Sequence, residues 1–169
     1  VVTIRENAFR NCSGITSIDL GAVETIGANA FSLTSNGTPN ALKSITLPAS
    51  LRSIGSYVFQ RRTALEEIII EEGIEEIGAS AFMDMSLGSD EACGVKKFTF
   101  PASVKTIGRA VLLGNTALEE IEILSQTPIS IGAKAFGDCP ALRSITFAVA
   151  SVPDIVRNTG ESASITIFS

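Results

Sequence analysis

The side chains of this sequence that could do chemistry are carboxylates and thiols, because none of its 169 residues is a histidine. Without imidazole the chain cannot build a Ser-His-Asp triad, a Cys-His dyad or most zinc and non-haem iron sites. Its three cysteines, Cys12, Cys93 and Cys139, match neither a disulfide framework nor a CxxC metal motif. We therefore predict no enzyme activity, no metal site and no cofactor.

Carboxylates gather between residues 66 and 76, where six glutamates occur without a basic residue. Such a cluster could hold Ca²⁺ or attract a basic partner. No Asp-x-Asp-x-Asp-Gly loop is present, and neighbouring side chains alternate faces along a strand, so we favour a solubilising surface. The cluster consists of Glu66, Glu67, Glu71, Glu72, Glu75 and Glu76, and a second acidic stretch holds Glu119, Glu120 and Glu122.

The composition excludes several classes of protein. Apolar residues make up 45% of the chain and charged residues 18%, which is unlike a disordered chain. A net charge of −5 argues against a nucleic-acid partner, which needs a basic face. No apolar run approaches 18 residues, so we expect no membrane insertion.

The elements that must position these side chains belong to a repeat of about 23 residues. Each copy has an isoleucine, usually followed by glycine, and a phenylalanine five positions later. The copies start at Ile4, Ile26, Ile54, Ile77, Ile107 and Ile131, and the fifth has Leu112 in place of the phenylalanine. In the uninterrupted copies, a stretch that ends in alternation begins six residues beyond the phenylalanine, as in Ile145-Thr146-Phe147.

Strands this short are stable only when stacked on their copies, so the repeat predicts a solenoid with short parallel strands. The Ala- and Ser-rich link, such as Ala79-Ser80-Ala81, predicts one helical turn in each coil. The glycine is expected at a turn that disfavours a Cβ, and the phenylalanines are expected to stack as a ladder. The predicted fold class is thus an α/β repeat solenoid, rich in β-structure.

Six repeat units are predicted over residues 1–147, followed by a C-terminal cap with one further strand over 148–169. Two insertions, near 32–40 and 84–94, fall at the same point of the unit and should emerge on the same edge. The first residues begin in the middle of a unit, which suggests upstream coils or a cap in a longer protein.

The repeat resembles the BspA-like leucine-rich repeat, also called the Treponema pallidum type. Residues 131–147, with Ile131-Gly132, Phe136, Cys139 and Leu142 in their places, lie close to the consensus of that family. Departures are Arg5 for glycine, Leu112 for phenylalanine, and Arg62, Met85 and Asn115 at the cysteine position.

The resemblance implies a right-handed coil with a sheet on its concave side. It also implies a secreted or cell-surface protein, its signal peptide removed, that binds proteins, extracellular matrix components or glycans in adhesion to host or microbial surfaces. The alternative is a passive structural stalk segment of a larger surface protein without a ligand of its own. The family offers no catalytic residues.

The concave face is the predicted binding face, since its outward residues form polar rows across the strands. Ile69 is the one large apolar residue among them. The predicted face comprises Asp19, Thr46, Glu67, Ile69, Lys97, Thr99, Glu120, Glu122, Ser144 and Thr146, with Ser17 and Ser44 beside them.

Three further features are interpreted more simply. The insertion at residues 84–94 could carry binding, or could be a tolerated loop. Cys12 and Cys139 occupy equivalent positions of the first and sixth units and are predicted to be small core residues, whereas Cys93 lies in the insertion and could be exposed. Asn11-Cys12-Ser13 and Asn36-Gly37-Thr38 match the glycosylation sequon, which has no meaning in a bacterial protein.

Overall fold

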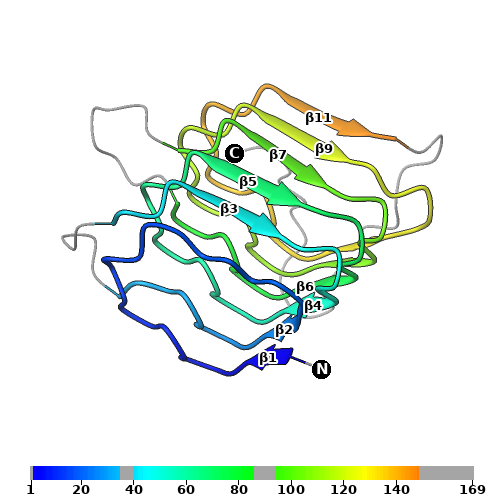
Figure 1. Ribbon diagram of the computed structural model, residues 1–169. Helices are drawn as coiled ribbons and strands as arrows, with labels where there is room; N and C mark the ends of the chain where they lie inside the picture. The colour runs from blue at the N-terminus through cyan, green and yellow to red at the C-terminus, as the bar shows by residue number, and fades with distance from the viewer. Residues whose placement is uncertain (1, 35–39, 86–93, 149–169) are drawn as a thin grey trace.

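The computed structural model describes residues 2–34, 40–85 and 94–148; the predicted cap over 149–169 and Cys93 lie outside the described residues. The described chain winds as a parallel β-solenoid (Figure 1), which confirms the coarse fold prediction. Its core is a continuous column of Ile, Leu, Val and Phe side chains that runs through every coil.

One sheet joins all six coils along one side of the solenoid, with one short strand from each coil. Its strands pair in parallel with anchor isoleucines side by side, so Ile26 pairs with Ile54 and Ile54 with Ile77. The sequence does not predict this sheet, because the glycine after each anchor isoleucine is expected at a turn. The strands in order are β1 (Val2–Ile4), β2 (Val23–Ile26), β4 (Ser53–Ile54), β6 (Glu76–Ile77), β8 (Thr106–Ile107) and β10 (Ser130–Ile131).

The predicted strands form a second series that lies side by side in Figure 1. Alternate residues point inward and outward, so the buried Ile45 and Leu47 of one strand enclose the exposed Thr46. The series consists of β3 (Ser44–Leu47), β5 (Glu67–Ile70), β7 (Lys97–Phe100), β9 (Glu120–Ile123) and β11 (Ser144–Phe147). We call the outward surface of these five strands the strand face.

The strand series is broken at two places. Residues 15–20 form no strand, so the strand predicted for the first unit is wrong, and no ladder of hydrogen bonds joins β5 to β7. Each break precedes a coil that follows an insertion and whose strand ends at a proline, Pro48 or Pro101. In other coils the residue at this place donates its N–H to the preceding coil, as Glu71 does to the Leu47 carbonyl at 3.0 Å. Proline has no N–H to donate.

The predicted helical turns are wrong, because the described residues contain no helix. Between the anchor isoleucine and the phenylalanine, alternate N–H groups bond to the next coil, as Phe31 N–H does to the Val58 carbonyl at 3.1 Å. The N–H groups between them close tight turns three residues back, as the Ala30 N–H does to the Gly27 carbonyl at 3.3 Å. The third residue after every anchor isoleucine has a left-handed backbone, with φ between 54° and 60°, which also ends any helix; these residues are Asn7, Asn29, Tyr57, Ser80, Ala110 and Lys134.

The glycine after the isoleucine is required by stacking and not by a turn. Its φ is not in the left-handed region, but a Cβ at Gly78 would lie 2.5 Å from the carbonyl carbon of Gly55 in the preceding coil. Corresponding contacts of 2.4–2.6 Å to backbone occur at Gly27, Gly55, Gly108 and Gly132. The coils therefore approach each other at this corner more closely than a side chain permits.

The phenylalanine ladder is confirmed for the first four coils. Phe9, Phe31, Phe59 and Phe82 stack with centroids 5.2–5.6 Å apart and nearly parallel rings. Leu112 interrupts the series in the fifth coil. Phe82 instead makes an edge-to-face contact with Phe98, with the ring centroids 5.0 Å apart.

In three coils the residue at the cysteine position is a hydrogen-bond donor that joins the coils. Its side chain donates to the carbonyl of the phenylalanine position one coil earlier: Arg62 Nε to Phe31 O at 2.6 Å, Asn115 Nδ2 to Phe82 O at 2.9 Å, and Cys139 Sγ to Leu112 O at 3.2 Å. Arg62 and Asn115 stand in the coils that follow the two insertions.

The prediction that both cysteines are core residues is wrong for Cys12, which is exposed because it lies in the first coil, where no described residue covers its outer side. Cys139 is partly buried against the core, and this burial raises the pKa of its thiol to about 11.

Candidate functional site

The strand face is a flat array of two outward rows. The row at the strand starts contains Ser44, Glu67, Lys97, Glu120 and Ser144, and the next contains Thr46, Ile69, Thr99, Glu122 and Thr146. The paired strands keep strict register, so Thr46 stands beside Ile69 and Thr99 beside Glu122. The structure thus places all but one of the predicted binding-face residues on one surface.

Asp19 is the exception. It is exposed but lies in the first coil, where no strand forms, and its carboxylate accepts the N–H of Gly21 at 3.0 Å. The rows therefore begin at β3, and Asp19 closes a local turn.

Charges on the strand face and just before its strands pair between neighbouring coils. Beside the strand starts, Lys43 Nζ lies 2.6 Å from Glu66 Oε1, and Arg143 binds Glu119. On the face itself, Lys97 Nζ lies 2.9 Å from Glu122 Oε1; this hydrogen bond raises the pKa of Lys97 and lowers the pKa of Glu122. Because these pairs are exposed, each contributes little to stability.

The acidic cluster at residues 66–76 is largely engaged by other coils. Besides Glu66, Glu71 accepts the Ala49 N–H at 2.8 Å, Glu72 accepts two N–H groups of the β7 coil, and Glu75 pairs with Lys105 at 2.7 Å. Glu67 and Glu76 have no such partner among the described residues. The favoured interpretation as a solubilising surface omitted this second role, which is to accept backbone and side-chain donors between coils.

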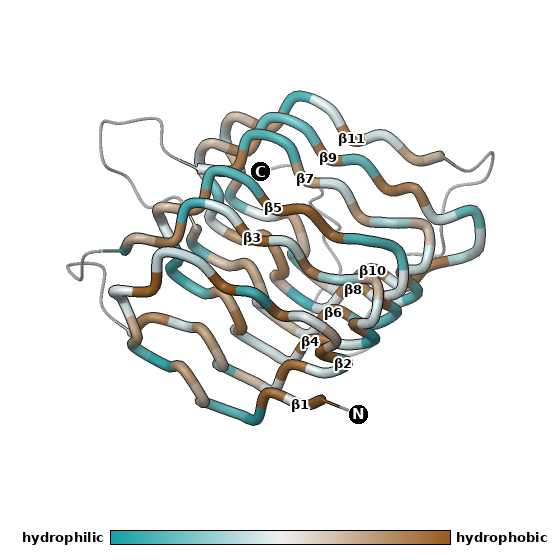
Figure 2. The backbone as a smooth tube through the Cα atoms, in the orientation of Figure 1, coloured by the Kyte–Doolittle hydropathy of each residue, from teal (hydrophilic) through white to brown (hydrophobic). Residues whose placement is uncertain are grey.

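The most apolar part of the strand face is β5, whose tube is brown in Figure 2. Ile69 points outward and is 47% exposed. The inward residues Ile68 and Ile70 are only partly buried, whereas those of β3, β7 and β9 are fully buried. This exposure follows from the break between β5 and β7. Leu124, just after β9, is a further exposed apolar residue that the sequence pattern did not single out.

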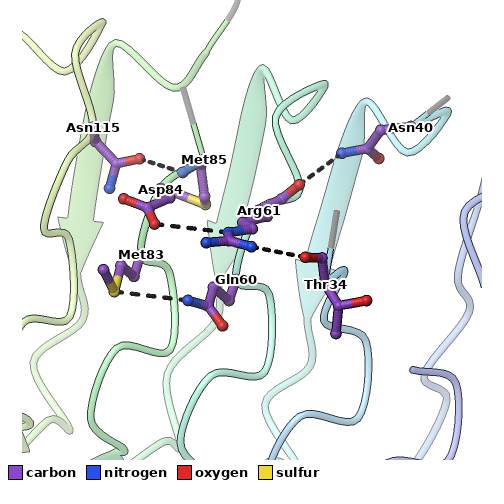
Figure 3. A network of polar contacts seen from close by, with 8 residues as sticks. All are labelled: Thr34, Asn40, Gln60, Arg61, Met83, Asp84, Met85 and Asn115. Carbon is purple, nitrogen blue, oxygen red and sulfur yellow. Dashed lines mark hydrogen bonds and ion pairs between the residues drawn. The ribbon is translucent and has the colours of Figure 1, made fainter. Parts of the chain in front are cut away.

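The flanks of both insertions lie on one edge, as their spacing predicts (Figure 3). Arg61 joins them: its Nη1 donates to Thr34 O at 2.8 Å, its carbonyl accepts from Asn40, and its Nε lies 4.0 Å from Asp84 Oδ2. Burial raises the pKa of Asp84 against the opposing effect of Arg61. The described part of this edge is thus a set of structural contacts between coils.

Within residues 2–34, 40–85 and 94–148, no three His, Cys, Asp or Glu side chains come together in a way that could hold a metal ion. The same part of the chain has no helix long and apolar enough to cross a membrane.

Comparison with protein families shows that the profile of the BspA type leucine rich repeat region matches residues 1–91 and 90–163, in six copies. No curated protein matches the sequence.

Three solved structures resemble the chain. A leucine-rich repeat protein from Bacteroides ovatus is 26% identical with a TM-score of 0.68, over 87% of this chain and 37% of its own. A leucine-rich repeat protein from T. pallidum is 24% identical with a TM-score of 0.74, over 91% and 64%. A leucine rich cell surface protein from Faecalibacterium prausnitzii is 21% identical with a TM-score of 0.36, over 90% and 49%. The chain thus spans less than two thirds of the length of each of these proteins.

Proposed function

The chain belongs to the BspA-type leucine-rich repeat family, and from this membership we propose that it is a protein-binding module without enzyme activity. The observation that carries the proposal is the strand face: ten outward side chains held in register within two adjoining sheets, with an exposed isoleucine among them. Flat arrays of this kind suit a macromolecule better than a small molecule, which needs a concave pocket.

The proposed role is adhesion by a secreted or cell-surface protein to extracellular matrix components or to other microbial surfaces. The acidic chain, with its net charge of −5, is consistent with a polypeptide or polysaccharide partner and not with nucleic acid. The same face on a passive stalk would only need to be polar.

A binding screen separates the two roles. The chain is applied to an array of immobilised extracellular matrix proteins and polysaccharides, beside the variant Ile69→Thr. Threonine already occupies this row at Thr46, Thr99 and Thr146, so the substitution removes apolar contact with little change to the strand.

We expect at least one protein on the array to bind, with affinity reduced about tenfold in Ile69→Thr, as for a central apolar anchor. The matched control is Tyr57→Asn, which removes a similarly exposed side chain from a turn outside the strand face and keeps a residue that tolerates the left-handed backbone there. Binding to no member of the array would favour the stalk, and binding that Tyr57→Asn weakens but Ile69→Thr does not would place the site elsewhere.

A further inference from the structure

The break between β5 and β7 leaves an apolar strip in the middle of the strand face. Ile69 is exposed there, and Ile68 and Ile70 on either side of it are partly exposed. The pattern of partial burial at both inward positions recurs only at β11, the last described strand. β5 is therefore an internal strand with the exposure of an edge strand, which is a favourable place for a partner to bury apolar surface.

The chemistry of the outward residues favours a polypeptide over a glycan. None of the ten outward residues of the five strands is aromatic, whereas sugar rings are commonly held by stacking on aromatic faces. An exposed isoleucine between threonines instead offers aliphatic contact, which a Leu, Val or Ile side chain of a partner would complement.

The charge of the two rows specifies the partner further. They hold one cation, Lys97, against three carboxylates, which leaves a net charge of −2. The Lys97 ammonium lies on Glu122, in the row beyond. Glu67 and Glu120, in the first row, form no ion pair among the described residues, although Glu120 is the register partner of Lys97 and attracts its ammonium.

Glu67 and Glu120 lie on β5 and β9, two strands apart, and the spacing of hydrogen-bonded strands sets about 10 Å as the lower limit of their separation, because no ladder joins β5 to β7. Side chains three or four residues apart on an extended chain span such a distance at about 3.4 Å per residue. A polypeptide that crosses the strands could therefore place one basic residue on each carboxylate and an aliphatic residue over Ile69.

We infer that the strand face binds a basic polypeptide, which crosses β5, β7 and β9 with an aliphatic side chain on Ile69 and cationic side chains at Glu67 and Glu120. This inference rests on the proposed function and names the chemistry of its partner.

The test uses a phage-displayed library of random peptides, selected on the whole chain and then counter-selected on Ile69→Thr. Enriched peptides are synthesised, and their affinities are measured by fluorescence anisotropy between about 50 mM and about 300 mM salt. The variants compared are Glu67→Gln with Glu120→Gln, and Glu76→Gln as the matched control. Glu76 is also exposed and without a partner among the described residues, but it lies in β6, outside the strand face.

We expect enriched peptides to contain at least two Lys or Arg residues and an aliphatic residue. The double variant should bind them roughly fivefold more weakly and with less dependence on salt, while Glu76→Gln stays within about twofold of the wild type. Peptides that depend on Ile69 but carry no basic residues, or that bind the double variant unchanged, would overturn the inference and leave the proposed function standing. If no enriched peptide depends on Ile69, both are wrong.

Discussion

Arg62 is the most informative residue to perturb, because its guanidinium is fully buried between three coils. Its Nε donates to Phe31 O at 2.6 Å and its Nη2 to Cys12 O at 3.1 Å. Burial lowers the pKa of this arginine. The side chain thus joins the third coil to the second and the first, beside the stem of the first insertion.

Arg62→Ala should destabilise the chain by about 3–5 kcal/mol. Each buried carbonyl that loses its donor costs about 1–3 kcal/mol, and the removed side chain leaves a cavity. Removing the buried charge recovers part of this cost, since the cation no longer has to be desolvated.

Two further variants at this position divide that loss into its causes. Arg62→Met keeps most of the volume and should cost about 1–3 kcal/mol, from the two carbonyls alone. Arg62→Cys restores the residue type of the family, and its thiol could donate to Phe31 O as Cys139 does to Leu112 O. It should be more stable than Arg62→Ala.

The measurement is urea unfolding followed by far-ultraviolet circular dichroism, with Arg52→Met as the matched control. Arg52 also donates to two backbone carbonyls, Ala49 O and Gly73 O, but it is exposed, so water replaces the lost donor and the cost should stay under about 1 kcal/mol. If Arg62→Met is as stable as the wild type, the hydrogen bonds of Arg62 contribute no net stability and the reasoning is refuted.

Three other perturbations test the frame. Lys134→Gly should raise the unfolding free energy by about 0.5–1 kcal/mol relative to Lys134→Ala, because φ is 55° there; equal stabilities would show that this backbone is not strained. Phe82→Ala should cost about 3–5 kcal/mol in the same unfolding assay, and a negligible loss would contradict the stacked ladder. The folded-state pKa of Cys139, about 11, exceeds its ordinary value of 9.0, so its contribution to stability is complete below pH 9 and is lost as the pH rises towards 11. Cys139→Ala should therefore lose less stability than the wild type over that interval, and parallel pH profiles would contradict a buried thiol.

The sequence predicted the solenoid because the positions that build its core repeat. The anchor isoleucine, the phenylalanine and the alternating stretch keep nearly constant separations, and the structure places each on the core column. Such regularity can be read from one chain without knowledge of contacts between coils.

What the sequence could not show is the competition for backbone hydrogen bonds between coils. The link Ala79-Ser80-Ala81 has good helix-forming composition, yet the Ser80 N–H bonds to the Arg109 carbonyl of the next coil at 2.8 Å. Helix propensity within a segment says nothing of a neighbour 29 residues along the chain, such as Arg109, whose carbonyl accepts the Ser80 N–H. The six-stranded sheet of anchor isoleucines was not predicted for the same reason, because its hydrogen bonds join different coils.

The candidate site was predicted in outline, because outward positions of a strand follow from alternation. Its most specific feature, the exposed middle of β5, depends on a broken ladder. That break combines a missing donor at Pro101 with the insertion before β7, and each of these was visible in the sequence only as a strand end or a loop.

These irregularities are confined to one side of the solenoid. The sheet of anchor isoleucines continues through all six coils, held by close backbone contacts that require glycine, and neither insertion interrupts it. The strand series is broken twice, and Arg62 and Asn115 supply donors to the carbonyls beside both insertions. The six-stranded sheet therefore maintains the stack of coils, while the strand series can vary in residue type and continuity. Because the strand series can vary, its polar face can expose Ile69 without loss of the fold.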